Sequence, residues 1–308
     1  MEAYMLQEKL TTIMNDLDTW QFPEIAEDMP HGDMPGDKVI ISEALVPHAQ
    51  TLFRLLVQMM KEKGDEKYVV SIFGGSGSGK SVTTSLLTYY LNQAGIRTYA
   101  MSGDNYPRRI PEYNDAERVS IFRSEGLKGL LKEQAYSTEV QAVLSELWKK
   151  ETDSDPAEAE TYPWLSIYQK YGRKGLEGYL GEDKEQDYAQ VNWVLSAFKS
   201  GQEKIWMKRM GRSEDARWYD EVDFSGTNVL LLEWTHSGSE KVQGVDIAVC
   251  LRSTPEETKA YRLFRARDGK ADSAFVTMVL EIEQAKLDAR MESNADIIIA
   301  KDGTVLRP

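Results

Sequence analysis

Cysteine and histidine are scarce in this chain of 308 residues. Cys250 is the one cysteine, which excludes an intrachain disulfide and a cysteine-built zinc site and fits a reducing compartment. The three histidines, His31, His48 and His236, are too far apart in the sequence for a metal-ligand spacing. We therefore expect neither disulfides nor a structural zinc ion to hold this fold together.

Basic residues are a minority as well: 37 Lys and Arg stand against 50 Asp and Glu, for a formal net charge of -13. Binding to a phosphate backbone needs a dense Lys/Arg surface, so the composition argues against nucleic acid as a partner and also against an anionic membrane surface. A small anionic ligand remains compatible, because a local basic pocket can lie within an acidic surface.

Long hydrophobic runs are missing. No segment approaches the roughly 20 apolar residues that span a membrane. The first twenty residues lack the basic start and apolar stretch of a signal peptide. The sequence therefore predicts a soluble cytoplasmic protein without a membrane partner.

Short apolar runs, in contrast, are present at regular intervals. Each is continuous rather than alternating, which is typical of buried strands in a parallel sheet, and helical patterns separate several of them. They predict an α/β fold of the doubly wound type with a mainly parallel five-stranded sheet. The predicted strands cover residues 67–73, 96–101, 228–234, 245–251 and 295–301.

The remaining segments predict the domain organisation. Residues 1–64 form a helical extension packed on the core, and residues 65–308 form the main domain. Within it, residues 113–224 are a largely helical, aromatic-rich insertion in which residues 204–210 and 216–222 read as a hairpin. Two uses of the extension stay open, an oligomer interface or a cover for the sheet, so a homo-oligomer is compatible with the sequence.

One segment carries an identifiable chemistry. Gly74-Gly-Ser-Gly-Ser-Gly-Lys80-Ser81 matches the P-loop pattern in full, and it follows a predicted strand and opens a predicted helix over residues 80–93. Its backbone amides and the helix N-terminus suit phosphate oxygens, Lys80 neutralises the β- and γ-phosphates, and the Ser81 hydroxyl suits Mg²⁺. A Gly/Ser linker is the alternative, which the strand and helix disfavour. The predicted nucleotide-binding residues are Gly74, Gly75, Ser76, Gly77, Ser78, Gly79, Lys80, Ser81 and Val82.

A second polar segment, Ser102-Gly-Asp104-Asn-Tyr-Pro-Arg108-Arg109, follows the second predicted strand. It lies where open α/β sheets bind ligands. Asp104 can accept the proton of an attacking hydroxyl or help to hold Mg²⁺, and Arg108 and Arg109 can clamp an anionic acceptor. The alternative is a capping aspartate in a proline-containing turn.

Glu233 ends the third predicted strand along the chain, where P-loop proteins often keep the acid that orients the magnesium water. Aspartate is more common than glutamate at this position in P-loop proteins. His236 follows at the same edge, either towards the cleft or as an ordinary loop residue.

These residues resemble the phosphoribulokinase, uridine kinase and pantothenate kinase family of P-loop kinases, as a divergent member. The family places a catalytic aspartate and often an aromatic residue after the second strand, which Asp104 and Tyr106 match. Its later helix ending Leu-x-x-Leu-Lys-x-Gly is similar to residues 195–201. The Glu-Gly that ends its third strand corresponds here to Glu233-Trp234.

The resemblance implies further site residues. Arg209 and Arg212 occupy the place of the family's substrate-side arginines, and residues 261–269 resemble its lid helix with Arg262, Arg265 and Arg267. In such a lid, arginines close over the transferred phosphoryl group, a role that falls first to Arg267.

The resemblance also implies a function: an ATP- and Mg²⁺-dependent kinase acting on a hydroxyl of a small molecule. Lys80, Asp104, Glu233 and Arg267 would be its catalytic residues, with Ser81, Asp104 and Glu233 at the metal and Tyr106, Arg108, Arg109, Arg209, Arg212 and His236 at the acceptor. A nucleoside, a sugar or sugar phosphate, and a pantothenate-like alcohol stay open as acceptors. An adenylylsulfate-type kinase, suggested by Gly103-Asp104-Asn105, and an ATP-dependent switch that binds a protein partner are the alternatives.

Overall fold

The structure, a computed structural model, describes residues 2–25, 29, 32–36, 40–259 and 273–307. The chain divides into two compact units, each described below by itself. The core unit comprises the described residues of 1–107, 187–258 and 287–308, and the helical unit those of 108–186 and 259–286. The domain boundaries expected from the sequence stay a prediction.

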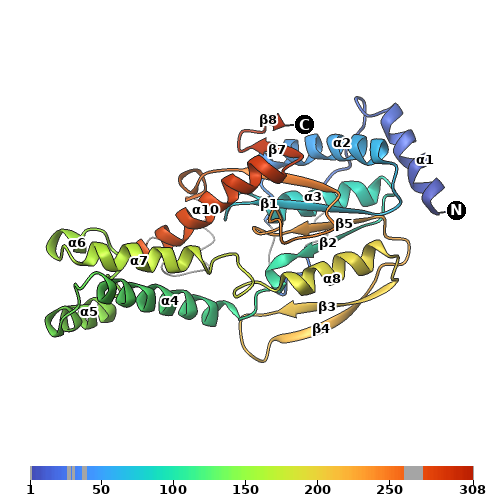
Figure 1. Ribbon diagram of the computed structural model, residues 1–308. Coiled ribbons are helices and arrows are strands. Elements are labelled where there is room, and N and C mark those ends of the chain that lie inside the picture. The colour runs from blue at the N-terminus through green and yellow to red at the C-terminus, as the bar shows by residue number, and fades with distance from the viewer. Residues whose placement is uncertain (1, 26–28, 30–31, 37–39, 260–272, 308) are drawn as a thin grey trace. The chain divides into compact units, whose positions relative to one another are not determined.

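The core unit is built on one sheet (Figure 1). Among the described residues, six strands lie in the order β2-β5-β1-β6-β7-β8, and all neighbouring pairs are parallel except β7 with β8. The predicted doubly wound, mainly parallel sheet is confirmed. The strands are β1 Tyr68–Gly74, β2 Thr98–Ser102, β5 Val229–Glu233, β6 Ile247–Arg252, β7 Ile297–Ala300 and β8 Val305–Arg307.

The sixth strand is an addition to the five that the sequence predicts. β8 has only three residues, none of them buried, so it carries no continuous apolar run that a sequence pattern could reveal. It adds an antiparallel edge beside β7.

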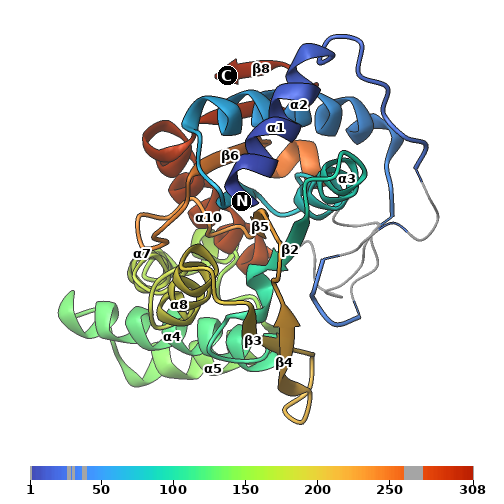
Figure 2. The same ribbon diagram turned by 90° about the vertical axis from the view of Figure 1, so that its right-hand side faces the viewer.

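Both faces of the sheet are covered, which explains why its inner strands carry continuous rather than alternating apolar runs. On β1, Tyr68, Val70 and Ile72 pack under helices α1 (Glu2–Asn15), α2 (Val46–Lys63) and α3 (Lys80–Gln93), and Figure 2 shows α1 lying against α2. Val69 and Phe73 point to the opposite face, which α8 (Tyr188–Lys199) and the last turns of α10 (Ala274–Asn294) cover.

Helices of the N-terminal segment belong to this core. Leu6, Leu10 and Ile13 of α1 are buried, and they join the same apolar cluster as the inner residues of α2. α2 ends at Gly64, whose φ of 74° is the left-handed cap that favours glycine. Both helices therefore contribute apolar area to the core unit.

The predicted hairpin is also present, as the antiparallel pair β3 (Lys204–Met210) and β4 (Arg217–Asp223). Ile205 and Met207 of β3 are buried against α8, whereas Trp206 between them is exposed. Alternation of this kind is expected for strands with one face on a core.

The helical unit is formed by α4 (Pro111–Lys132), α5 (Thr138–Lys150), α6 (Glu158–Thr161), α7 (Leu165–Glu177) and the first part of α10. Helices α4 and α7 approach closely because each has glycines on the facing side. A Cβ on Gly126 of α4 would lie 2.5 Å from the ring of Tyr168, and one on Gly172 of α7 would lie 2.6 Å from that of Phe122. Those two rings meet edge to face at 5.4 Å.

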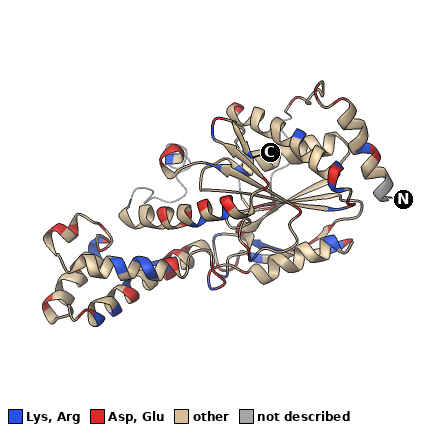
Figure 3. Cartoon of the chain, turned by 45° about the horizontal axis from the view of Figure 1, so that its top comes forward, with Lys and Arg blue, Asp and Glu red and all other residues tan. Residues whose placement is uncertain are grey.

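Charged residues of both signs alternate along the exposed faces of these helices (Figure 3). Lys128 with Glu125, and Lys149 with Glu146, form ion pairs one helical turn apart. Exposed pairs of this type contribute little to the stability of a helix, so the apolar cluster around Phe122 and Tyr168 is the main source of stability.

Shortening single side chains of α1 to alanine tests whether the N-terminal helix is part of the core. Leu10 is fully buried, so Leu10→Ala should lower the free energy of unfolding by about 2–5 kcal/mol, as for other buried leucines. Met5 on the same helix is 52% exposed, and Met5→Ala should change it by less than about 0.5 kcal/mol. Urea denaturation of both variants measures the difference, and equal stabilities would show that α1 does not pack as described.

Candidate active site

The phosphate loop connects the end of β1 to the first turn of α3. Gly79 is the N-cap of α3, and its φ of 93° lies in the left-handed region that favours glycine. A side chain at this position would also collide with Leu45, because Cδ1 of Leu45 lies 2.6 Å from the place of the Cβ. Glycine is therefore required here by backbone conformation and by packing.

Lys80 begins α3 and is largely buried. Its Nζ donates a hydrogen bond to the carbonyl oxygen of Gly75 at 3.1 Å, so the ammonium group is held within the loop. The helix N-terminus adds about half a positive charge at the same place. Loop amides, ammonium group and helix terminus together form an electropositive cradle that fits phosphate oxygens.

Three neighbouring strands end at the same edge of the sheet. Ser102, the last residue of β2, is in register with Glu233, the last residue of β5, and Glu233 is in register with Ile72 of β1. The phosphate loop begins just beyond Ile72, and Asp104 lies two residues beyond Ser102. The two acidic side chains and the loop thus share the carboxyl edge, where open α/β sheets bind ligands.

The two acidic residues differ in environment. Asp104 is exposed and lies in the short 3-10 turn η2 (Gly103–Asn105). Glu233 is only 9% exposed. Next to it, Trp234 packs directly on the turn, since a Cβ on Gly103 would lie 2.1 Å from Cγ of Trp234. Gly103 therefore has to be glycine for the turn to lie under this ring.

A pocket opens at this edge. Ser81 of α3, Ser102 of β2 and Glu233 of β5 line it, and Gly32 and Met34 of the N-terminal segment line it as well. Sequence reasoning missed the last two, because residues 27–37 read only as a Pro/Gly-rich acidic stretch that ends a helical pattern. No local pattern distinguishes a loop that lines a pocket from one that does not.

Arg209, a predicted acceptor residue, lies in a buried ion pair. Its Nη1 is 2.9 Å from Oδ2 of Asp33, its Nε is 3.1 Å from Asp220, and its Nη2 donates to the hydroxyl of Tyr99. Burial raises the pKa of Asp33, and the guanidinium of Arg209 counteracts this shift. Burial and the neighbouring Asp33 raise the pKa of Tyr99 above its usual range, which keeps its hydroxyl protonated as a donor to Asp33.

The other predicted acceptor residues of the core unit lie in different surroundings. Tyr106 is completely buried in the apolar cluster of α8 and β3. His236 is buried and meets the ring of Trp234 edge to face at 5.2 Å. Arg212 is exposed in the turn of the hairpin. Their contacts with an acceptor stay a prediction.

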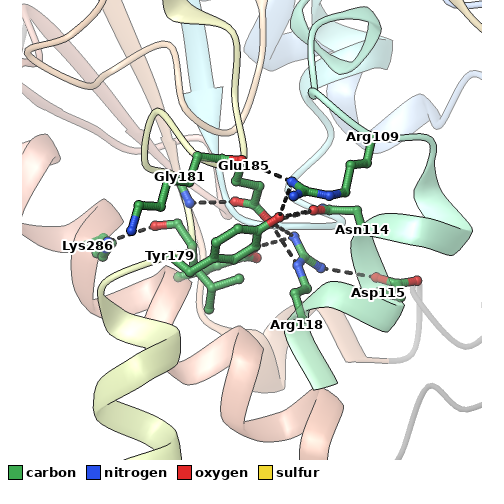
Figure 4. A network of polar contacts seen from close by, with 11 residues as sticks. Arg109, Asn114, Asp115, Arg118, Tyr179, Gly181, Glu185 and Lys286 are labelled. Carbon is green, nitrogen blue, oxygen red and sulfur yellow. Dashed lines mark hydrogen bonds and ion pairs between the residues drawn. The ribbon is translucent and has the colours of Figure 1, made fainter. Parts of the chain in front are cut away.

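Arg108 and Arg109 begin the helical unit, where both contact the loop between α7 and α8. Figure 4 shows the guanidinium of Arg109 directed towards Tyr179 of this loop. The guanidinium of Arg108 donates to the carbonyl oxygen of Asp183. That of Arg109 donates to the carbonyl oxygen of Lys184 at 3.1 Å and to the hydroxyl of Tyr179 at 3.3 Å. In the structure these two arginines thus hold a loop, and their contact with an acceptor stays a prediction.

The same loop is fixed by a buried ion pair that sequence reasoning missed (Figure 4). Glu185 is fully buried and accepts hydrogen bonds from Arg118, Asn114 and the amide of Gly181, with 2.7 Å between Nη2 of Arg118 and Oε1. Burial alone would lower the pKa of Arg118, but Glu185 and Glu283 outweigh it and raise the pKa.

Arg262, Arg265 and Arg267, the predicted lid arginines, lie outside the described residues. Within the part of the chain that the structure does describe, no group of three or more His, Cys, Asp or Glu side chains could hold a metal ion. No helix of that part is long and apolar enough to cross a membrane. The thiol of Cys250 is buried in β6, and burial raises its pKa to about 12, so it is not a reactive nucleophile.

A loop of this sequence between a buried parallel strand and a helix defines a P-loop protein of the α/β class. No protein-family model matches the chain. Among curated proteins, it is 37% identical over 258 residues to the bifunctional alpha-galactosidase/sucrose kinase AgaSK of Mediterraneibacter gnavus. The match covers 83% of this chain but 22% of that protein, so the chain spans about a fifth of its relative's length.

The similarity to a protein that carries a sucrose kinase activity confirms the predicted resemblance to kinases of small molecules. Solved structures also match, among them two kinases. One is a candidate fructose transport system kinase from Silicibacter sp. TM1040, with 14% identity, a TM-score of 0.49 and coverage of 80% of this chain and 95% of that chain. The other is a candidate uridine kinase from Bacillus stearothermophilus, with 14% identity, a TM-score of 0.43 and coverage of 82% and 98%.

The contact of Gly103 with Trp234 gives a prediction about the turn at the site. A Cβ at this position has no space, so Gly103→Ala should lower the free energy of unfolding by about 1–3 kcal/mol, the usual cost of overpacking, and should shift tryptophan emission. Gly178 is a matched control, since the nearest atom to its Cβ position is 3.5 Å away. Gly178→Ala should leave stability unchanged or raise it by up to about 1 kcal/mol. Urea denaturation followed by fluorescence measures both, and a Gly103→Ala variant as stable as wild type contradicts the contact.

Proposed function

We propose that the chain is an ATP-dependent kinase that transfers the γ-phosphoryl group to a hydroxyl of a sugar, with sucrose as the first acceptor to test. The observation that carries this proposal is the register of β2, β5 and β1, because it gathers Asp104, Glu233 and the phosphate loop at one edge of the sheet. A cradle for phosphates beside an exposed carboxylate is the minimum that phosphoryl transfer to an alcohol requires.

Sugar as acceptor is supported by the curated relative. That protein is named for two activities, and the chain spans about a fifth of its length. Hydrolysis of a galactoside needs two acidic residues that flank the glycosidic bond, and it needs no nucleotide. A P-loop, in contrast, serves to bind the phosphates of a nucleotide. The sucrose kinase activity is therefore the one that corresponds to this chain.

ATP rather than GTP is supported by the last parallel strand. A guanine-specific loop carries Asn/Thr-Lys-x-Asp, and the segment after β7 reads Ala300-Lys-Asp-Gly303 instead. For Mg²⁺, the Ser81 hydroxyl and the carboxylates of Asp104 and Glu233 are the hard oxygen donors that this ion prefers. When bound, the ion neutralises charge on the phosphate oxygens.

In the reaction, the bond between the γ-phosphorus and the bridging oxygen of ADP breaks while a bond to the acceptor oxygen forms. Asp104 accepts the proton of the acceptor hydroxyl. Lys80 and the loop amides hold the nucleotide phosphates and stabilise the charge that develops on them. Arg267 closes over the transferred group, in the role that the family resemblance implies for it. Positioning and charge neutralisation thus account for the rate enhancement.

Two substitutions separate the proposed roles. Lys80→Ala removes the cation from the phosphate cradle, so transfer should be abolished and ATP affinity reduced. Asp104→Asn keeps the shape of the side chain but cannot accept a proton, so kcat should fall about 10²- to 10⁴-fold, as for other general bases. ATP affinity of Asp104→Asn should stay as in wild type. Calorimetry and a coupled ADP assay measure the two quantities.

The control is Asp215→Asn, which changes an exposed carboxylate in the turn of the β3–β4 hairpin and should leave kcat unchanged. Product mass after incubation with ATP, Mg²⁺ and sucrose, fructose, uridine, adenylylsulfate or a pantothenate-like alcohol identifies the acceptor. ATP hydrolysis without any phosphorylated product would contradict the proposal in favour of a switch. Full activity of Asp104→Asn would refute its assignment as base.

A further inference from the structure

Asp33 is an acidic residue whose side chain is buried although the residue lies in a loop. Its side chain is 8% exposed, in the described segment Gly32–Gly36 of the N-terminal region. Four donors surround the carboxylate: the amide of Ser102, the side-chain amide of Asn105, the hydroxyl of Tyr99 and the guanidinium of Arg209. A buried carboxylate with this many donors is stabilised in one position.

Two of these donors belong to the turn that carries Asp104. Oδ1 of Asp33 accepts from the backbone amide of Ser102 at 2.6 Å and from Nδ2 of Asn105 at 3.0 Å. Ser102 is the N-cap of the η2 turn and Asn105 is its last residue. One oxygen atom therefore ties together the two ends of the turn around Asp104.

The other oxygen connects this turn to the hairpin. Oδ2 of Asp33 accepts from the hydroxyl of Tyr99 at 3.0 Å and from Nη1 of Arg209 at 2.9 Å. Asn105 completes the connection, because its Oδ1 accepts from the amide of Met210 at 3.0 Å. Asp33 is thus the common partner of β2, the η2 turn and β3.

The residues on each side of Asp33 lie at the pocket of the candidate site. Gly32 and Met34 line it together with Ser81, Ser102 and Glu233. Residues 32–34 therefore contact the η2 turn through the side chain of Asp33, and Gly32 and Met34 line the pocket.

We propose that Asp33 is a positioning residue for phosphoryl transfer, which holds the η2 turn so that Asp104 meets the acceptor hydroxyl. This inference rests on the proposed kinase function. A displacement of a reacting group by about 1 Å can reduce a rate about 100-fold, so a turn that carries the base has to be held firmly.

The test compares Asp33→Asn with Asp220→Asn. An amide at position 33 carries no charge and offers one acceptor oxygen in place of two, so it cannot accept from the turn and from Tyr99 and Arg209 at the same time. Asp220 is the other carboxylate on Arg209, at 3.1 Å from Nε, and its contacts with Arg209 and Trp218 do not involve the turn. We expect kcat of Asp33→Asn to fall roughly 10- to 100-fold with KM for ATP unchanged, and Asp220→Asn to retain wild-type kcat.

A second variant covers the case in which Asp33→Asn does not fold because the buried charge of Arg209 has lost its main partner. Asn105→Ala removes the hydrogen bonds from the side-chain amide of Asn105 to Asp33 and no charge, and it should lower kcat in the same direction. Wild-type kcat in Asp33→Asn or in Asn105→Ala would overturn the inference.

Hydrogen exchange separates this inference from the proposed function. The amide of Ser102 should exchange faster in Asp33→Asn than in wild type and Asp220→Asn, whether or not an acceptor is known. A wild-type protein that phosphorylates no sugar would refute the proposed function, whereas unchanged Ser102 exchange in Asp33→Asn would refute the role of Asp33 alone. A fall in kcat together with faster Ser102 exchange supports the inference.

Discussion

Parallel pairing of β2, β5 and β1 is the constraint on which the candidate site depends. Because side chains alternate along a strand, a register shift by one residue would turn the buried residues of β5 to the opposite faces of the sheet. The observed register sets Ser102 beside Glu233 and Glu233 beside Ile72. Everything that follows these residues, namely the η2 turn and the phosphate loop, is thereby gathered at the carboxyl edge. The chemistry of the site is a consequence of sheet packing.

Buried ion pairs fix the segments that the sheet does not hold. Asp33 with Arg209 ties the N-terminal segment to β3 in the core unit, and Glu185 with Arg118 ties the loop after α7 to α4 in the helical unit. Desolvation makes such pairs poor sources of net stability, but removal of one partner is costly. These ion pairs therefore fix the conformation of segments that have no regular secondary structure.

The place where the chain departs from its family resemblance has a structural counterpart. Trp234 stands where the family has glycine, and its ring needs space that a side chain at position 103 would take. Gly103 provides that space.

Much of this arrangement follows from the sequence alone. Continuous apolar runs predicted the five parallel strands, and the motif from Gly74 to Ser81 predicted the phosphate loop, because both depend on interactions between neighbours in the chain. β8 was missed since three partly exposed residues carry no periodic signal. The sequence predicted that Asp104 and Glu233 lie at one edge only because the carboxyl ends of parallel strands share an edge of the sheet.

Tertiary structure alone decided the surroundings of the site. Asp33 lies 69 residues from Ser102 and 176 from Arg209 along the chain, and nothing in its own segment indicates that it is buried. Likewise, the sequence could not indicate that Arg209 pairs with Asp33 and Asp220, or that Arg108 and Arg109 bind loop carbonyls. A local pattern determines which backbone conformation is favoured. A buried polar contact depends on which distant groups are brought together and removed from water, and only the folded chain determines that.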